Sequence, residues 1–74
     1  MQVTVKLYGS FRVHRFKEGL GHYPEGATVQ AVVVALGIPL EQADIVIINE
    51  QRASIEHVLH DGDVVAIFPL VAGG

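Results

Sequence analysis

The absence of cysteine is the feature that most constrains how this chain of 74 residues can fold. A chain of this length buries only about 60% of its unfolded surface, so its core is small. Without cysteine it can form neither a disulfide framework nor a zinc ribbon, and it has no thiolate nucleophile. One small apolar core must therefore provide all of the stabilisation.

The composition of the chain supplies such a core. Half of the residues are hydrophobic, and only 18% are charged. Disordered chains have the opposite composition, with low hydrophobicity and high net charge. The length is enough for one domain and not for two. We therefore expect one compact globular domain.

The charge balance argues against nucleic acid as a partner, because the net charge is −3 and nucleic-acid-binding domains usually carry a basic excess on one face. The one basic stretch, residues 12–17, is typical of a solvated face. No apolar stretch reaches the ~20 residues that a membrane-spanning helix needs. The N-terminal residues alternate between apolar and polar, unlike a signal peptide. We therefore expect a cytoplasmic protein that binds neither nucleic acid nor membrane.

The first strand is predicted from the alternation of polar and apolar side chains over residues 2–8. This period of two places Val3, Val5 and Leu7 on the buried side. Residues 11–23 should hold a second strand, but two glycines make a regular long strand unexpected there. Strand character is strongest at residues 13–16 and 20–23.

A single helix is predicted between Thr28 and Gly37, where apolar residues recur on one helical face. Thr28 can act as the N-cap through its hydroxyl, and Gly37 supplies a left-handed C-terminal residue before Pro39. Valine is a poor helix former, so burial against the rest of the protein must stabilise this helix. The apolar positions are Val29, Val32, Val33 and Leu36.

Two further strands are predicted from apolar runs at residues 45–48 and 64–68. The first run is apolar on both faces, as expected for a strand that is covered on both sides or placed centrally. Pro69 ends the second strand because it has no N–H. The segment that connects these two strands is predicted to contain a turn at 49–51, a short strand at 53–55, a helical turn at 57–59 and a tight turn at 61–63. This order of elements predicts an α+β fold, with one helix on one face of a small mixed sheet.

The C-terminal segment is the most informative part of the sequence, because it is apolar, then small, and carries no charge after Asp63. A merely solvated end would more often contain Lys, Glu or Ser. Six extended residues reach roughly 20 Å, and glycine without a Cβ can enter a narrow channel. We therefore expect residues 1–69 to form the domain and residues 70–74 a flexible tail. The segment reads Phe68-Pro69-Leu70-Val71-Ala72-Gly73-Gly74.

The group that such a tail can present to a partner is the C-terminal carboxylate of Gly74. A carboxylate becomes reactive after adenylation with ATP, and a sulfide equivalent can then displace AMP to leave a thiocarboxylate. The chain contains no phosphate-binding loop and no catalytic pair for this step. His57 and His60 could share a helical face, but they lack a third ligand of obvious spacing. We therefore expect no catalytic residue, no metal and no cofactor bound by this chain, with ATP used by a partner enzyme.

Five short motifs follow one another along the chain: Pro24-Glu25-Gly26-Ala27-Thr28-Val29, Leu36-Gly37-Ile38-Pro39, Val46 to Asn49, Asp61-Gly62-Asp63, and Phe68-Pro69 through Val71 to Gly73-Gly74. Each is weak alone, but their order and spacing resemble the MoaD/ThiS family of sulfur carriers, relatives of ubiquitin with the β-grasp fold. Residues 10–23 depart from the family pattern, and Leu70 replaces a second proline common in the family.

The resemblance implies that a ubiquitin-activating-type enzyme adenylates Gly74, which then carries sulfur as a thiocarboxylate. The ending is most similar to the small subunit of molybdopterin synthase. In that case the tail enters the large catalytic subunit and donates sulfur to a pterin precursor, and this chain is not itself an enzyme. Two alternatives stay open: a ubiquitin-like modifier joined to lysines through Gly74, and a non-covalent β-grasp interaction domain. The acceptor of the sulfur also stays open among molybdopterin, tungstopterin, thiazole and transfer RNA.

A docking face is predicted from the two aromatic residues nearest the tail. Tyr8 follows the buried side chains of the first strand by one position, so it points to the opposite face of the sheet. In the last strand we assign Val65 and Ile67 to the helix side, which places Phe68 on the same face as Tyr8. A contiguous apolar patch there would suit a partner. The predicted partner-binding residues are Tyr8, Phe68, Pro69, Leu70, Val71 and Ala72.

Overall fold

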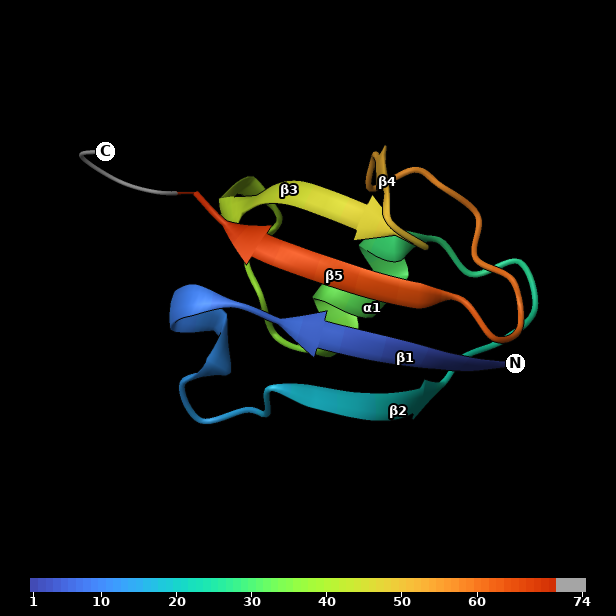
Figure 1. Ribbon diagram of the computed structural model, residues 1–74, viewed down its shortest axis with the longest axis horizontal. Helices are drawn as coiled ribbons and strands as arrows, with labels where there is room; N and C mark the ends of the chain where they lie inside the picture. Colours follow the sequence, from blue (N-terminus) through green and yellow to red (C-terminus); the bar gives the residue numbers. More distant parts are fainter. Residues whose placement is uncertain (71–74) are drawn as a thin grey trace.

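The computed structural model describes residues 1–70, and it shows one helix packed on one face of a five-stranded sheet (Figure 1). The predicted α+β fold is therefore confirmed. Two short 3-10 turns, η1 and η2, accompany the regular elements. In chain order the elements are β1 (Gln2–Leu7), η1 (Gly9–Arg12), β2 (Glu18–His22), α1 (Val29–Ala35), η2 (Leu40–Gln42), β3 (Ala43–Ile48), β4 (Gln51–Ala53) and β5 (Val64–Pro69).

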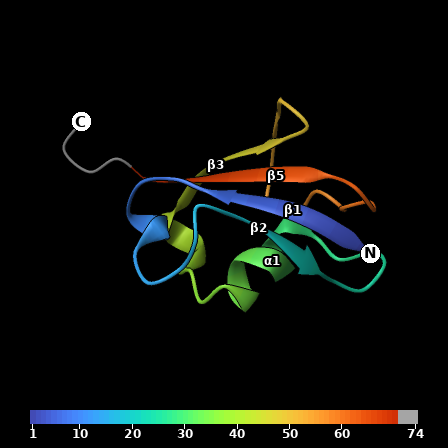
Figure 2. The same cartoon turned by 60° about the horizontal axis from the view of Figure 1, so that its bottom comes forward.

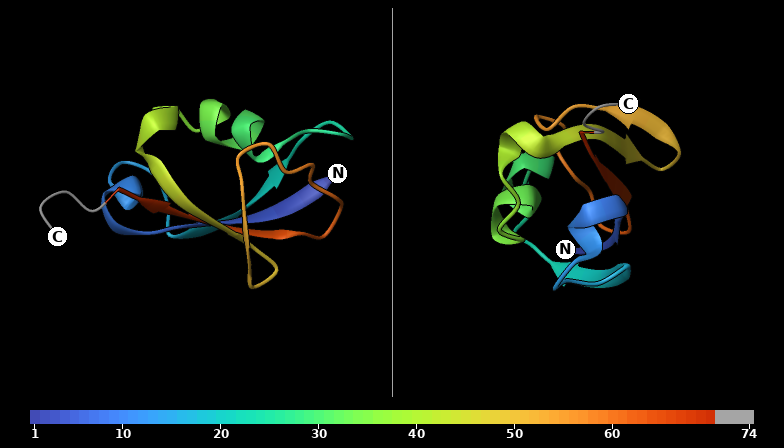
Figure 3. Two further views of the ribbon diagram at one scale, coloured as in Figure 1. Left: turned by 90° about the horizontal axis from the view of Figure 1, so that it is seen from above. Right: turned by 90° about the vertical axis from the view of Figure 1, so that its left-hand side faces the viewer.

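The strand order is β2-β1-β5-β3-β4, which places β5 at the centre of the sheet. β1 and β5 run parallel, and the other neighbouring pairs are antiparallel, so the sheet is mixed as predicted. Figures 2 and 3 show α1 on one side of the sheet only. We call the opposite side the helix-free face. Because β1 and β5 are parallel, they end at the same edge of the molecule.

The core lies between α1 and the sheet. The inward side chains of β1 alternate as predicted, and Val65 and Ile67 are fully buried on β5. The side chain of Thr28 accepts a hydrogen bond from the Ala31 N–H at 3.4 Å, which confirms the predicted N-cap. Burial of α1 compensates for the poor helix propensity of valine. The largest fully buried side chains are Val3, Val5, Leu7, Val29, Val32, Val33, Leu59, Val65 and Ile67.

The second strand differs from the prediction, because β2 spans only Glu18–His22 and residues 13–16 form no strand. Its two glycines, Gly19 and Gly21, pair with the inward residues of β1 and leave the core side of β2 without side chains. The rings of Phe16 and Tyr23 occupy this space: a Cβ on Gly21 would lie 2.6 Å from the Tyr23 ring. Aromatic rings from outside the strand thus let a glycine-rich strand pair regularly.

The connection between β3 and β5 also differs from the prediction. Asn49 and Glu50 both have positive φ, 49° and 71°, and form a two-residue turn, so β4 begins at Gln51 and not at residue 53. Residues 57–59 form no helical turn, since Val58 makes an extended bridge with Thr28. The helical face proposed for two histidines does not exist there. β3 is likewise not the central strand, and its outward isoleucines need another explanation.

The turn before β5 joins three parts of the sheet through hydrogen bonds. The Asp63 carboxylate accepts from the His60 N–H at 2.8 Å and from the Asn49 amide at 2.9 Å. The Asp63 carbonyl accepts from the Thr4 N–H at 2.9 Å. Burial raises the pKa of Asp63, but these hydrogen bonds and the charges of His60 and His57 together lower it below its usual range. Asp63 therefore fixes the start of β5 against its neighbours.

Replacing Asp63 with Asn should reduce the free energy of unfolding by about 1 kcal/mol near neutral pH, because the amide keeps only one of the two acceptor oxygens and carries no charge. The folded-state pKa of Asp63 is lowered, so its carboxylate stabilises the fold above the unfolded-state pKa. This contribution is lost as pH falls through the folded-state pKa. Urea unfolding at about pH 6 and about pH 2.5 should thus show the difference between wild type and Asp63→Asn shrinking at the lower pH. A difference that stays constant with pH would show that the ionised form has no stabilising role.

Candidate functional site

The last described residues attach the tail to the sheet. β5 continues through Pro69, one residue further than predicted, where Pro69 pairs with Ala43. The Leu70 N–H then donates to the Gln42 carbonyl at 3.0 Å, so the backbone of Leu70 is held against η2. The Leu70 side chain is 59% exposed. Pro69 removes one donor without ending the strand, because the following residue supplies the next hydrogen bond.

The remaining residues of the predicted tail lie outside the described residues. These are Val71, Ala72, Gly73 and Gly74. The predicted mobility of the tail and the role of its carboxylate therefore stay predictions. What the structure does define is the place where the tail begins, at the end of β5 and beside η1 (Figure 1).

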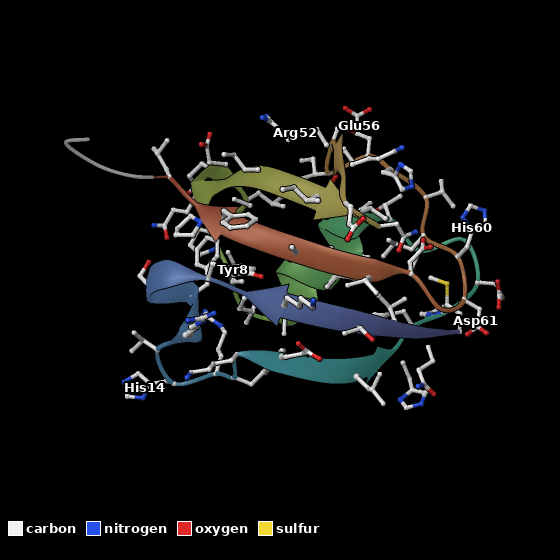
Figure 4. The ribbon with its side chains drawn as sticks, in the orientation of Figure 1. Tyr8, His14, Arg52, Glu56, His60 and Asp61 are labelled. Carbon is white, nitrogen blue, oxygen red and sulfur yellow. The ribbon has the colours of Figure 1, made fainter. Side chains whose placement is uncertain are left out.

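Tyr8 and Phe68 stack on each other beside this point, with ring centroids 4.2 Å apart and planes at 11°. Both side chains are half-buried on the helix-free face, which confirms the predicted assignment of the two faces of β5. Parallel pairing of β1 and β5 brings them together, and the Tyr8 N–H donates to the Ile67 carbonyl at 3.3 Å. Figure 4 shows Tyr8 at the end of β1, next to β5.

A guanidinium group completes the aromatic pair. The Arg12 guanidinium carbon lies 5.0 Å from the centroid of the Tyr8 ring. The Arg12 Nε donates to the Leu7 carbonyl at 2.7 Å, which holds the side chain in this position. A cation over an aromatic face is attracted by the ring quadrupole. η1 therefore places a positive charge at the edge of the docking face, close to the start of the tail.

A shallow open hollow of about 300 Å³ extends from the aromatic pair across the helix-free face. Its floor is apolar, while Lys6 and Glu50 place charges of both signs at its rim. An apolar centre with a polar rim is the common arrangement of a protein-binding surface. We call it the docking hollow, and its lining residues are Lys6, Tyr8, Ile47, Glu50, Val64, Ala66 and Phe68.

The sequence prediction missed the contribution of β3 to this surface. Ile47 lies directly opposite Ala66 on β5, and Ile45 lies opposite Phe68. Both isoleucines are half-buried on the helix-free face. The signal for them was the apolar run at residues 45–48, because β3 has no second layer to cover its outward side chains. Lys6 and Arg12 carried no sequence signal, since a single charge on a surface strand or turn is common.

Gly9 allows η1 to pack closely against Pro69, just before the start of the tail. Its φ is +56°, and a Cβ there would lie 2.9 Å from the Pro69 Cγ. Gly9→Ala should therefore lower the free energy of unfolding by about 2 kcal/mol and shift the amide resonance of Leu70.

Gly37→Ala is the matched control, because Gly37 has φ +74° but a Cβ at this position would meet open space. It should cost about 1 kcal/mol from backbone strain alone and leave Leu70 unchanged. Equal costs for the two variants, with no shift at Leu70, would show that Gly9 does not position the tail.

The histidines lie away from this site. His60 and Asp61 are at the opposite end of the molecule from Tyr8, and His14 is in the loop after η1 (Figure 4). Within residues 1–70, no three His, Asp or Glu side chains come together in a way that could hold a metal ion. None of the helices in this part of the chain is long and apolar enough to cross a membrane.

Comparison with known proteins gives one family. Residues 5–74 match the sequence profile of the ThiS family. A search of curated proteins gave no match. Among solved structures, a Pyrococcus furiosus protein assigned as molybdopterin converting factor, subunit 1, superposes with a TM-score of 0.76 at 28% identity, over 96% of this chain and 99% of that one.

Two further structures share the fold at lower identity. Small archaeal modifier protein 1 from Haloferax volcanii has a TM-score of 0.78 at 21% identity, over 95% of this chain and 98% of that one. A chain in the complex of subunits 1 and 2 of the molybdopterin-converting factor from Helicobacter pylori has a TM-score of 0.65 at 22% identity, with both chains fully covered. These likenesses confirm the predicted ubiquitin-like β-grasp fold.

Proposed function

Because the chain belongs to the ThiS family, small sulfur carriers with a ubiquitin-like fold, we propose that its working group is the C-terminal carboxylate of Gly74. A partner enzyme adenylates this carboxylate, and the product is converted to a thiocarboxylate that donates sulfur in the synthesis of a cofactor. The chain itself is a carrier or a non-catalytic small subunit. ATP binds to the partner and not to this chain.

The chemistry needs two displacements. In the first, a carboxylate oxygen of Gly74 attacks the α-phosphorus of ATP, and pyrophosphate leaves. In the second, a sulfide equivalent supplied by a donor attacks the acyl carbon, and AMP leaves with both electrons of the broken C–O bond. One carboxylate oxygen is thereby replaced by sulfur. This chain contributes the reacting group and the surface that positions it.

The observation that carries the proposal is that the tail begins at the edge of the docking hollow. The Leu70 N–H donates to the Gln42 carbonyl, which holds Leu70 two residues after Phe68 of the stacked pair. Five residues from Leu70 to Gly74 can span roughly 17 Å when extended. A partner that binds over the hollow can therefore bind the tail in its active site at the same time. Docking of the domain holds the carboxylate close to the reacting group, whereas a free carboxylate would have to be positioned by its own weak binding.

We favour the large catalytic subunit of molybdopterin synthase as the second partner, with a pterin precursor as the sulfur acceptor. The likeness to the Pyrococcus furiosus protein at 28% identity supports this choice, and the Helicobacter pylori complex offers a geometry for it. The alternative is a protein modifier joined to lysines through Gly74, which the likeness to the archaeal modifier keeps open. Both functions begin with the same adenylation.

An exchange assay tests the shared first step. The activating enzyme from the same genome, with ATP and labelled pyrophosphate, should incorporate label into ATP only when this protein is present. Exchange occurs because the adenylate forms reversibly. If the enzyme supports exchange with other carriers of the genome but not with this one, the proposed function is wrong.

A further inference from the structure

Among residues 1–70, no strand pairs with the outer edge of β2, and the hydrogen-bonding groups of this edge are arranged in a regular row. The β1–β2 register makes Met1·Tyr23 and Leu7·Lys17 hydrogen-bonded pairs, with Met1 N to Tyr23 O at 2.8 Å and Leu7 N to Lys17 O at 2.9 Å. In an antiparallel pair, hydrogen-bonded and non-hydrogen-bonded positions alternate. The residues of β2 that turn their backbone N–H and C=O away from β1 are Glu18, Leu20 and His22.

The same three residues carry exposed side chains on the helix-free face. They pair with Lys6, Thr4 and Gln2 of β1, whose side chains point to that face. Leu20 is 63% exposed at the middle of the strand, which makes it the most exposed large apolar side chain among residues 1–70. In Figure 1 no other described element lies beside β2 on the side away from β1. Edge strands of sheets are usually short or charged, which prevents pairing with another chain. The strand at the other edge, β4, has only three residues.

We propose that β2 pairs with β2 of a second copy, antiparallel and centred on Leu20, to join two sheets edge to edge. A two-fold axis that passes between the two strands at Leu20 places Leu20 opposite its own equivalent. It also places Glu18 of each copy opposite His22 of the other, an acid facing a base on both sides of the axis. All three outward N–H groups of each copy then find a carbonyl, and the exposed leucines cover one another.

The strand is self-complementary in three independent respects, which is the requirement for an isologous two-fold interface. The outward backbone groups are arranged symmetrically about Leu20, the apolar side chain lies next to the axis, and the acid and the base exchange places. Opposite charges directly across a strand pair are favourable, and like charges are unfavourable.

This interface leaves the docking hollow open. The two-fold axis is perpendicular to the joined sheet, so both helix-free faces lie on the same side. Because the two copies of β5 then run in opposite directions, the two tails begin at opposite ends of the assembly. A single strand pair buries little surface, and such small interfaces are weak, so we expect a dissociation constant of roughly 0.1–1 mM.

Amide NMR spectra of the whole protein at concentrations up to about 2 mM test the proposal. Resonances of residues 18–22 should shift with concentration along one binding curve, and rotational correlation times should rise together with them. His22→Glu should weaken the association by about tenfold or more, because it places two acids opposite each other twice. The double variant Glu18→His/His22→Glu should restore it, since the acid and the base have only exchanged places.

Phe68→Ala is the control for association through the other surface, and it should dimerise like the wild type. Thermal unfolding of each variant at low concentration shows whether the monomer is intact. The proposal is overturned by concentration-independent spectra of residues 18–22. It is equally overturned by a double variant as weak as His22→Glu, or by shifts centred on Tyr8 that Phe68→Ala removes. None of these results bears on the chemistry of Gly74.

Discussion

Phe68→Ala is expected to weaken the proposed complex with a large catalytic subunit by roughly thirtyfold, which corresponds to about 2 kcal/mol. Phe68 stacks on Tyr8 in the apolar lining of the docking hollow, next to the start of the tail. Aromatic residues at the centre of a desolvated interface contribute most of its binding energy. Isothermal titration calorimetry with the purified partner measures the loss directly.

The same substitution should cost the isolated domain only about 1 kcal/mol, the value of a lost aromatic contact on a half-exposed surface. Ile67→Ala is the matched control, one position earlier on β5 and fully buried on the helix side. It should reduce the free energy of unfolding by about 3 kcal/mol, because it leaves a cavity between the sheet and α1. It should leave partner affinity nearly unchanged under conditions where the variant is folded. The opposite result, with Phe68→Ala unfolding the domain and Ile67→Ala weakening only the complex, would refute the docking face.

Deletion of Gly74 is expected to have a larger effect, with sulfur loading reduced by at least about a hundredfold. The deletion leaves a carboxylate on Gly73, but that group lies one residue short, roughly 3.5 Å from where the activating enzyme needs it. Misplacement by even about 1 Å can slow a positioned reaction a hundredfold. Single-turnover loading with the activating enzyme, ATP and a sulfur donor provides the measurement.

The control for this deletion is the stability of the domain in the deletion variant. In this variant, residues 1–70 should keep their thermal stability and their amide spectrum, because the last contact with the domain that the structure describes is made by the Leu70 N–H. Loading of the deletion variant at the wild-type rate would mean that the enzyme does not read the position of the carboxylate. A variant that loses its fold would instead assign the tail a structural role.

The parts of the fold that could be predicted are those where local pattern and final environment agree. Val3, Val5 and Leu7 alternate because one side of β1 faces α1, and they are buried as that pattern requires. The helix was predictable because Thr28 and Gly37 mark its ends. Each of these signals is complete within about ten residues, so no knowledge of the rest of the chain is needed.

The segments that could not be predicted depend on residues far from themselves or on backbone conformations that their sequence does not favour. β2 has two glycines and forms because Phe16, before the strand, and Tyr23, after it, cover them on the core side. The turn at Asn49 and Glu50 requires positive φ at both positions, for which Asn-Gly is the usual sequence and Glu is uncommon. Because the residue types do not signal that turn, the predicted start of β4 lies two residues too late.

The candidate site shows the same division. Strand alternation placed Tyr8 on the helix-free face, and it left two possible faces for the last strand, of which we chose the one that puts Phe68 beside Tyr8. The contact between the two rings depends on the pairing of β1 with β5, which alternation does not give. The pairing of Ile45 and Ile47 with β5 could not be inferred, since it depends on the strand order β1-β5-β3. The apolar run in β3 favoured a central strand, whereas its outward side chains lie on the helix-free face beside β5.

The measurement that tests the central claim most directly is the mass of the C-terminal peptide after reaction. The protein is incubated with the activating enzyme of its own genome, ATP and a sulfur donor, and is then cleaved and analysed by mass spectrometry. We expect the peptide that ends in Gly73-Gly74 to gain the mass difference between sulfur and oxygen, and a reaction without ATP to leave it unchanged. A terminal peptide that stays an unmodified carboxylate, or that is found only in amide linkage to a lysine, would contradict the assignment of this chain as a sulfur carrier.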